Sequence, residues 1–367
     1  MSEFDESIDE KIMSEKTEDV TDKKCPHCGA TVTFDPATGG MHCEYCGYTC
    51  QIPAPDSEDE ICELDFEAAL HTESHNWGEQ KKSVQCKQCG AVSIYDVLET
   101  AALCPFCGST NVMPAATEDT IAPNAVCPFA VTKEDAGKKF SNWLSNKWFA
   151  PKKAKQNASP DAFQGVYLPY WTYDTQTTSS FTARAGFDTT VHDKNGTQTK
   201  TTWHRVNGVY QKFIDDQTVL ASKRHANSYV TSCEPFDFSR LVPYSPQVVA
   251  GFIAERYSVG LKEGWEMAQK NIQSRLRNDI GSYVCHHWRA DRYDSLKFST
   301  IYSNITYKYL LVPVWISSFK YKDKVYQFVV NGQTGKVAGK SPVSAWRVLW
   351  AVLFGAAVMA VLYFLNE

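Results

Sequence analysis

The chain has 367 residues, of which 43% are hydrophobic and 22% charged, and this composition excludes a wholly disordered protein. Its length allows two or three folded units. The net charge of −5, from 42 acidic and 37 basic residues, does not suit a protein whose main activity is coating nucleic acid.

The first 22 residues are predicted to form a disordered acidic tail. They contain nine acids and two lysines, and they lack the apolar segment of a signal peptide. We therefore expect the cysteines that follow to lie in a reducing compartment, where disulfide bonds rarely form.

Eight of the 13 cysteines form four Cys-x-x-Cys pairs. In each of two consecutive sets, 14 residues separate the two pairs, and the second set repeats the first 61 residues later. In a reduced protein this spacing predicts two zinc ribbons, each holding one Zn2+ ion in a tetrahedron of four thiolates. We expect two zinc ions per chain, with the ligands Cys25, Cys28, Cys43, Cys46, Cys86, Cys89, Cys104 and Cys107.

Each ribbon is predicted to be a β-hairpin between its two pairs. In the first, residues 30–34 alternate like a strand, residues 35–40 have turn composition, and a return strand starts at Met41. The glycine after each pair is expected to take a positive φ beneath the metal; these are Gly29, Gly47, Gly90 and Gly108. The competing metal is iron in a rubredoxin-like site that moves electrons.

The unpaired cysteines are expected to be small buried side chains: Cys50, Cys62, Cys127, Cys233 and Cys285.

The predicted ribbons occupy residues 23–50 and 81–115, and an acidic linker occupies residues 51–80. Residues 56–67 of the linker contain seven acids and no base. The first ribbon has no lysine or arginine from Cys25 through Cys50, and the second is only weakly basic. A protein partner is therefore favoured, and a nucleic acid is possible but not favoured by charge.

Residues 116–345 are predicted to form an aromatic-rich α+β domain, a mostly antiparallel sheet with packed helices. A helix is expected to begin at Thr132, with Asp135 at the capping-box position, and to end at Pro151. Its apolar face comprises Phe140, Trp143, Leu144 and Trp148, which we expect in the core. Seven lysines lie between residues 133 and 155, on a solvated face or against anionic lipid headgroups.

Two stretches with a Pro-x-Trp kernel predict duplicated strands of one sheet. They are residues 166–173, around Pro169 and Trp171, and residues 310–316, around Pro313 and Trp315. A strand over residues 326–330 and a turn at Asn331-Gly332 follow the second kernel. Between the kernels, residues 246–284 are predicted to be helical, with two apolar faces: Ala250, Ile253, Ala254 and Tyr257; and Trp265, Ala268, Ile272, Leu276 and Ile280.

The C-terminal residues 346–365 are predicted to form one transmembrane helix. Residues 348–365 carry no charge, and Trp346, Trp350 and Tyr363 lie where interfacial aromatics are found. Arg347 is expected to extend toward the headgroups. The bases Lys336, Lys340 and Arg347 precede the helix, so we expect a tail-anchored plasma-membrane protein with its large domain in the cytoplasm. The alternative is a buried C-terminal helix of a soluble domain.

No ATPase, hydrolase or metalloprotease motif is found, so no catalytic or organic cofactor-binding residue is predicted. Residues 332–341 resemble a phosphate-binding loop, but Thr334 stands where that motif needs glycine, so a turn and short strand are expected. The pair His286-His287 is expected to be split between strand faces, and Asp215-Asp216 is expected to form a turn.

The chain resembles bacterial membrane proteins described as having a transcription-factor-IIB-type zinc ribbon. The resemblance rests on the Cys-Pro-x-Cys-Gly ribbons, on the stretches 165–171, 244–257 and 308–315, and on the turn at residues 331–335. Such proteins are often labelled as similar to the primosomal replication helicase, but that label covers the ribbons alone, since the helicase ATPase motifs are absent here. The resemblance implies a zinc-binding membrane protein without a settled activity.

These observations favour a cytoplasm-facing binding or scaffolding module for another protein. The alternatives are a nucleic-acid-binding membrane protein linked to replication or transcription, and a redox protein or enzyme with an unrecognised site. No oligomeric state is predicted.

Overall fold

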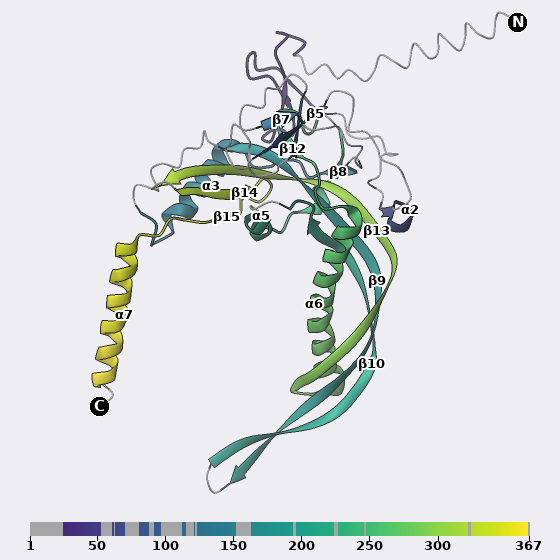
Figure 1. Cartoon of the computed structure of the whole chain (residues 1–367), viewed down its shortest axis with the longest axis vertical. Coiled ribbons are helices and arrows are strands. Elements are labelled where there is room, and N and C mark those ends of the chain that lie inside the picture. The colour runs from purple at the N-terminus through teal and green to yellow at the C-terminus, as the bar shows by residue number, and fades with distance from the viewer. Residues whose placement is uncertain are drawn as a thin grey trace, which may run out of the picture.

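The structure is a computed structural model that describes residues 25–52, 61, 63–69, 81–87, 92–96, 112–114, 121, 123–151, 163–193, 196–223, 227–245, 247–321 and 324–365. The predicted acidic tail lies outside these residues. The fold is α+β, as expected, with a mostly antiparallel sheet that curls into a long arm (Figure 1).

Two antiparallel strands of 30 residues form the centre of the sheet. β9 (Gln164–Asp193) pairs with β13 (Arg292–Tyr321), and the two predicted Pro-x-Trp kernels lie opposite each other, with Tyr167 opposite Pro313. β10 (Gly196–Leu220) covers the other edge of β9. Register shifts in both pairings mark bulges, which bend and twist strands and so contribute to the curl.

The shorter strands extend the sheet at the end of the arm that forms the body. The sheet order is β11, β8, β13, β9, β12, β6, β5, β7, with β14, β15 and β4 attached through β13. Their bounds are β4 Leu64–Asp65, β5 Lys81–Cys86, β6 Val92–Asp96, β7 Val112–Pro114, β8 Ala125–Val126, β11 Val242–Pro243, β12 Ile253–Glu255, β14 Lys324–Asn331 and β15 Val337–Gly339. The strand and turn predicted over residues 326–332 are confirmed, as is the short strand that replaces a phosphate-binding loop.

The helix α6 (Leu261–Trp288) lies along the inner, concave side of the arm (Figure 1). Its predicted apolar face is confirmed, since Trp265, Ala268, Ile272, Leu276 and Ile280 are all buried. The prediction of helix for residues 246–260 is wrong: a turn covers 247–250, and Ile253–Glu255 forms β12. β12 lies between β9 and β6, so its three residues are buried through pairing on both edges. His286 and His287 were expected on a strand. That expectation is wrong, because both lie in the last turn of α6.

The helix α3 (Lys133–Ser145) begins as predicted, with Thr132 accepting a hydrogen bond from the Asp135 amide at 3.2 Å. It ends six residues before Pro151, at Ser145. Phe140 and Leu144 are buried, but Trp148 lies beyond the helix and is 74% exposed. The expectation that Trp148 packs in the core is therefore wrong, because the helical periodicity stops before it.

Smaller helices complete the body: α2 (Phe66–Ala69), α5 (Asn227–Cys233) and the short 3-10 helix η2 (Phe238–Arg240). β4 and α2 belong to the segment expected to be a linker. β4 pairs with β13, and the buried ring of Phe66 packs against Tyr173 and Trp265. This part of the segment is thus attached to the arm.

The C-terminal helix α7 (Ala345–Leu365) extends away from the body (Figure 1). Among the described residues it is the one helix long and apolar enough to cross a membrane, over Ala345–Tyr363. None of its apolar window is buried, which contradicts the alternative of a core helix.

Candidate functional site

The first four cysteines lie on two backbone turns of the same form. The Cys25 amide donates to the Ala30 carbonyl at 2.6 Å, and the Cys43 amide donates to the Tyr48 carbonyl at 2.8 Å. In each turn the glycine after the pair has φ of 73°, as predicted for Gly29 and Gly47. A side chain at this backbone conformation would be strained, so glycine lets each turn close beneath the sulfurs.

A short hairpin brings the two turns together. β1 (Thr33–Asp35) pairs with β2 (Gly40–His42), and β2 also pairs with β3 (Thr49–Cys50), which gives a three-stranded sheet. The Asp35 carboxylate accepts hydrogen bonds from the Ala37 amide and the Thr38 hydroxyl, which fixes the hairpin turn. The hairpin predicted between the cysteine pairs is confirmed.

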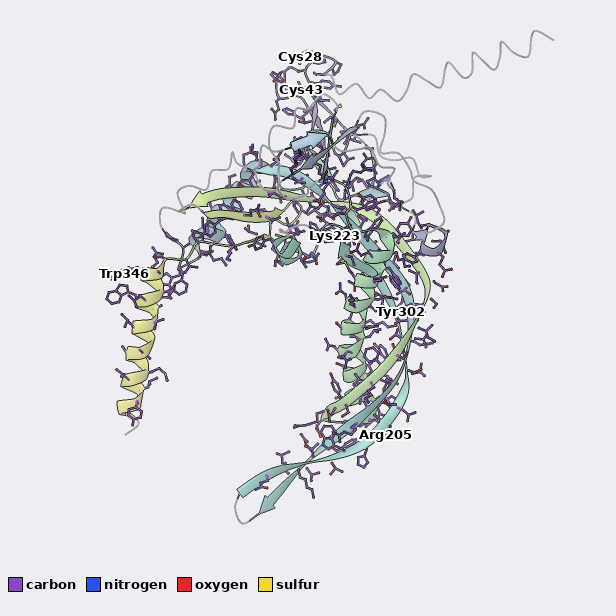
Figure 2. All side chains as sticks on the ribbon, viewed as in Figure 1. Cys28, Cys43, Arg205, Lys223, Tyr302 and Trp346 are labelled. Carbon is purple, nitrogen blue, oxygen red and sulfur yellow. The ribbon has the colours of Figure 1, made fainter. Side chains whose placement is uncertain are left out.

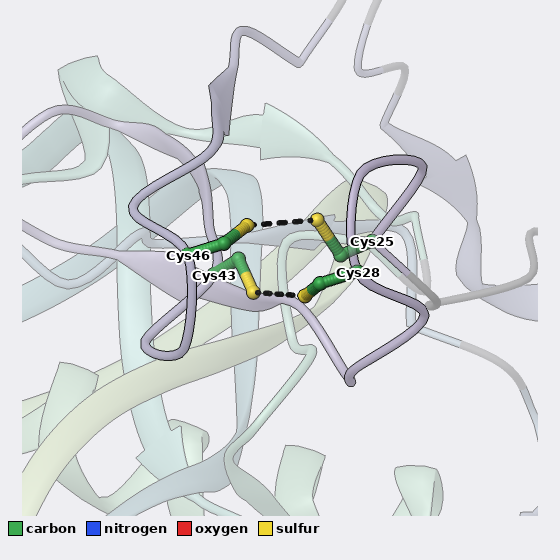
Figure 3. A group of neighbouring side chains, drawn as sticks. All are labelled: Cys25, Cys28, Cys43 and Cys46. Atoms are coloured by element: carbon green, nitrogen blue, oxygen red, sulfur yellow. Dashed lines mark hydrogen bonds between the residues drawn. The ribbon is translucent and has the colours of Figure 1, made fainter.

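The four sulfurs converge on one point between the turns (Figure 3). Cys25 Sγ lies 3.4 Å from Cys46 Sγ, and Cys28 Sγ lies 3.6 Å from Cys43 Sγ. All four lie within 4.8 Å of one another. Zn–S bonds of about 2.3 Å in a tetrahedron put sulfurs roughly 3.8 Å apart. The cluster therefore has the donor set and spacing to hold one tetrahedral metal ion.

The backbone favours the thiolate form of one ligand. A hydrogen bond from the Cys46 amide, with a weaker one from the Tyr45 amide, lowers the pKa of Cys43 to about 7. Partial desolvation acts in the opposite direction but does not outweigh these amides. Amide donors stabilise the charged sulfur that a metal requires.

The structure does not bring the second predicted set together within the described residues. Cys86 is the last residue of β5, whereas Cys89, Cys104 and Cys107 lie outside the described part of the chain, together with Gly90 and Gly108. The second zinc site therefore stays a prediction. The strands around it do contribute to the main sheet, since β6 pairs with β12.

The unpaired cysteines are distributed over the fold. Cys127 and Cys233 are fully buried, as expected, and burial raises the pKa of each thiol to about 12. Cys285 is partly buried, and Cys50 is exposed, so the expectation of burial is wrong for Cys50. Cys62 lies outside the described residues.

The first ribbon is docked on the body. The Phe34 amide donates to the Ala250 carbonyl at 3.1 Å, and the Phe34 ring meets Phe252 edge-on. Phe252 continues into an aromatic cluster with Phe129, Tyr167 and Trp315. The four-cysteine cluster thus lies at one end of a hairpin whose other end is part of the domain core.

A groove of about 530 Å³ lies where the ribbon meets the body. Its lining includes the aromatic residues Phe34, Phe163, Phe252 and Trp315, the acidic residues Asp35, Glu44 and Glu134, and one lysine, Lys133. The ribbon supplies one wall of this groove, the start of α3 another, and the segments around Gly165 and Phe252 the rest. The lining residues are Thr33, Phe34, Asp35, Pro36, His42, Glu44, Thr132, Lys133, Glu134, Phe163, Gln164, Gly165, Gly251, Phe252, Ile253 and Trp315.

A second group of ionisable side chains lies at the base of the arm. The Lys308 ammonium is 3.0 Å from Asp216, 3.3 Å from Glu63 and 3.5 Å from Asp174. Asp174 is only 1% exposed and accepts a hydrogen bond from the Asp216 amide. Asp215 also lies near these carboxylates, but the lysine already supplies a positive charge among them. We interpret the group as an internal ion-pair network.

The pair Asp215-Asp216 stands out in the sequence, but its partners Asp174, Glu63 and Lys308 do not. Both residues lie at a bulge of β10 between Ile214 and Gln217, and not in a turn. Asp174 and Lys308 come from β9 and β13, so only the strand register brings them together. No local spacing in the sequence carries that information.

Burial, with the Glu63 carboxyl next to it, raises the pKa of Asp174 to about 7. Contact with Asp174 in turn lowers the pKa of Glu63. Asp174 therefore holds a proton in the folded chain across a pH range in which an ordinary aspartate is ionised.

Comparison with known proteins gives one relative without an assigned activity. The chain is 29% identical over 335 residues to the uncharacterized protein YdjG of Bacillus subtilis (strain 168). The aligned residues cover 89% of this chain and 91% of that protein. No protein-family model matches the sequence. No solved structure matches it either.

The first prediction concerns the metal. Substitution Cys43→Ser removes one of four thiolates, and we expect it to release the metal of the first ribbon and to unfold that ribbon. Elemental analysis of the purified protein should show the loss of one zinc ion per chain, from two in the wild type. Cys50→Ser is the matched control, because Cys50 is exposed and outside the cluster.

Iron in excess of zinc in the wild type would contradict the zinc assignment. Loss of both metals on the single substitution would show that the two ribbons form one cooperative unit.

The second prediction concerns pH. The unfolded chain releases the Asp174 proton near pH 3.9, whereas the folded chain holds it to about 7, so the free energy of unfolding should fall as pH rises between these values. The slope is at most about 1.4 kcal/mol per pH unit. Asp174→Asn should abolish this pH-dependent part of the free energy of unfolding. Chemical denaturation of both proteins in detergent from pH 4.5 to 7.5 would measure it as the difference between wild type and the variant.

Metal release at low pH lowers the free energy of unfolding in both wild type and Asp174→Asn. Subtracting one profile from the other therefore removes this opposite trend. Asp279→Asn, which removes an ion pair with Lys212 elsewhere on the arm, is the control. Parallel profiles for Asp174→Asn and wild type would contradict the assigned proton.

Proposed function

We propose that this chain is a membrane-anchored zinc protein that presents a binding groove to a protein partner in the cytoplasm. The observation that carries the proposal is the placement of the four-cysteine cluster, whose hairpin forms one wall of the groove and packs into the aromatic core. A metal that holds a wall of a groove determines the shape of that groove without taking part in chemistry.

The chemistry of the groove favours a peptide segment with basic and apolar side chains. Aromatic rings in the lining can receive apolar groups, and the three carboxylates of the lining attract positive charge. The same carboxylates repel phosphates, so this surface does not suit a nucleic acid. The resemblance to membrane proteins with zinc ribbons supports the same general function, and a second zinc ion in the second ribbon belongs to this proposal.

The membrane part of the proposal rests on α7. A helix that is apolar on all sides and unburied cannot remain in water as a monomer, and its length matches the thickness of a bilayer core. Lys336, Lys340 and Arg347 on its N-terminal side favour a cytoplasmic location for the body.

The third prediction tests the anchor. Full-length protein should stay in the membrane fraction in high salt and carbonate and be released only by detergent. Deletion of residues 346–367 should move it to the soluble fraction with its zinc content unchanged, because the four-cysteine cluster lies in a separate part of the fold. Release of the full-length protein by salt alone would contradict the anchor, as would a truncated protein that remains membrane-bound.

The fourth prediction tests the groove. Affinity capture from a detergent extract should recover a protein partner with the wild-type protein. Recovery should drop severalfold with Glu134→Lys, which reverses a charge in the lining of the groove. Glu67→Lys is the matched control, since it makes the same change in the first turn of α2, outside the groove. Cys43→Ser should also lose the partner, whereas Cys50→Ser should keep it.

Equal recovery with Glu134→Lys and Glu67→Lys would contradict the groove as the binding surface. Recovery of DNA or RNA with an affinity that falls steeply with salt would instead support a nucleic-acid-binding protein.

A further inference from the structure

The loop after α3 exposes two adjacent aromatic side chains. Trp148 is 74% exposed and Phe149 is 38% exposed, and their rings lie 5.7 Å apart. Trp148 is the most exposed tryptophan in the described part of the chain. Neither ring is needed for the core, which the preceding residues Phe140 and Leu144 already fill. A pair of exposed aromatic rings on a folded body indicates a contact with another apolar phase.

This loop is joined by hydrogen bonds to the first turn of α7. Arg347 donates from one guanidinium nitrogen to the carbonyls of Trp148, at 2.5 Å, and Ala150, at 3.0 Å. The Ser344 amide donates to the Phe149 carbonyl at 2.9 Å. Arg347 thus binds the body, in contrast to the expectation that it extends to the headgroups. The aromatic pair is thereby held at the level where α7 begins.

The first turns of α7 present further aromatic rings near this level. Trp346 is 65% exposed and Trp350 is 57% exposed, and their rings meet edge-on. Figure 2 shows Trp346 pointing away from the body at the start of the helix. Four exposed aromatic rings, from segments about 200 residues apart in sequence, therefore lie around the junction.

In the sequence, the two chain segments that meet at the junction carry charge of one sign. No acidic residue occurs in residues 136–160 or in residues 324–366, while these two segments contain ten lysines and arginines. The acids of α3, Glu134 and Asp135, lie at its opposite end. Tryptophan rings with adjacent basic side chains suit the headgroup layer of an anionic bilayer, where the ring finds both apolar and polar neighbours.

We propose that Trp148 and Phe149 form a second membrane contact, which inserts into the headgroup layer of the anionic bilayer that α7 enters. The occupant is lipid and not a protein, because the pair is joined to the start of the apolar helix and because the chain segments that meet there contain basic residues and no acidic ones. The contact orients the body on the membrane, which a single helix on a free linker would not do. This inference rests on the membrane anchoring proposed above.

The test uses full-length protein in vesicles of phosphatidylcholine and phosphatidylglycerol. The fluorescence of Trp148 is obtained as the difference between wild type and Trp148→Phe, a change that leaves an aromatic ring in place. Two quenchers report its surroundings: acrylamide, which is neutral and stays in water, and lipids brominated near the headgroup end of the acyl chains. Trp203→Phe, on the arm, is the aqueous control, and Trp346→Phe reports insertion of α7.

We expect the brominated lipids to quench the Trp148 component and acrylamide to quench it severalfold less than the Trp203 component. If Trp346 is quenched by lipid while Trp148 is quenched by acrylamide alone, the inference is wrong and the anchor stands. If Trp148 is protected from both quenchers, a protein or a second copy of the chain covers it, which also overturns the inference. If lipid quenches neither Trp148 nor Trp346, the anchor itself is wrong, and the inference falls with it.

Discussion

Buried aromatic side chains on β9 and β13 determine where the outer elements of the fold lie. A buried tyrosine or tryptophan needs a hydrogen-bond acceptor for its polar atom, and four on these strands find a backbone carbonyl: Tyr167, Trp171, Tyr173 and Trp315. Trp171 Nε1 donates to the Val259 carbonyl at 2.8 Å and Tyr173 Oη to the Leu261 carbonyl at 2.7 Å, which positions the start of α6. Trp315 Nε1 donates to the Val131 carbonyl at 2.8 Å, directly before α3. The central strand pair thus sets the positions of the helices as well as of the sheet.

A hydrogen bond of the same kind, from a buried tyrosine to a backbone carbonyl, connects the four-cysteine cluster to the core. Tyr167 Oη donates to the Val248 carbonyl, in the turn whose Ala250 carbonyl accepts from Phe34 of the ribbon. Because structural zinc sites supply folding free energy directly, the proposed metal would stabilise one end of this chain of contacts, and the strand pair stabilises the other. The groove lies between them, so its shape depends on both.

Features with local causes were predictable from the sequence. The cysteine turns, their glycines, the cap at Thr132 and the apolar face of α6 each depend on residues within one or two turns of chain. Features that depend on distant pairing were not. The apolar spacing around Ile253 fits a helix as well as a buried strand, and pairing with β9 and β6 decides for the strand. The network of Lys308 and Asp174 depends on strand register in the same way, so no window of sequence reveals it.

The directions of the arm and of α7 place a constraint on how the chain meets a bilayer. Figure 1 shows both extending from the same side of the body, and the end of the arm carries exposed charged side chains such as Arg205 (Figure 2). These side chains and the unpaired strand edges cannot enter hydrocarbon. Insertion of α7 therefore requires its axis to swing away from the arm. The hydrogen bonds of Ser344 and Arg347 lie at the start of α7, where such a swing would turn. Trp148 and Phe149 would thus stay at the point of entry, while the arm comes to lie outside the bilayer.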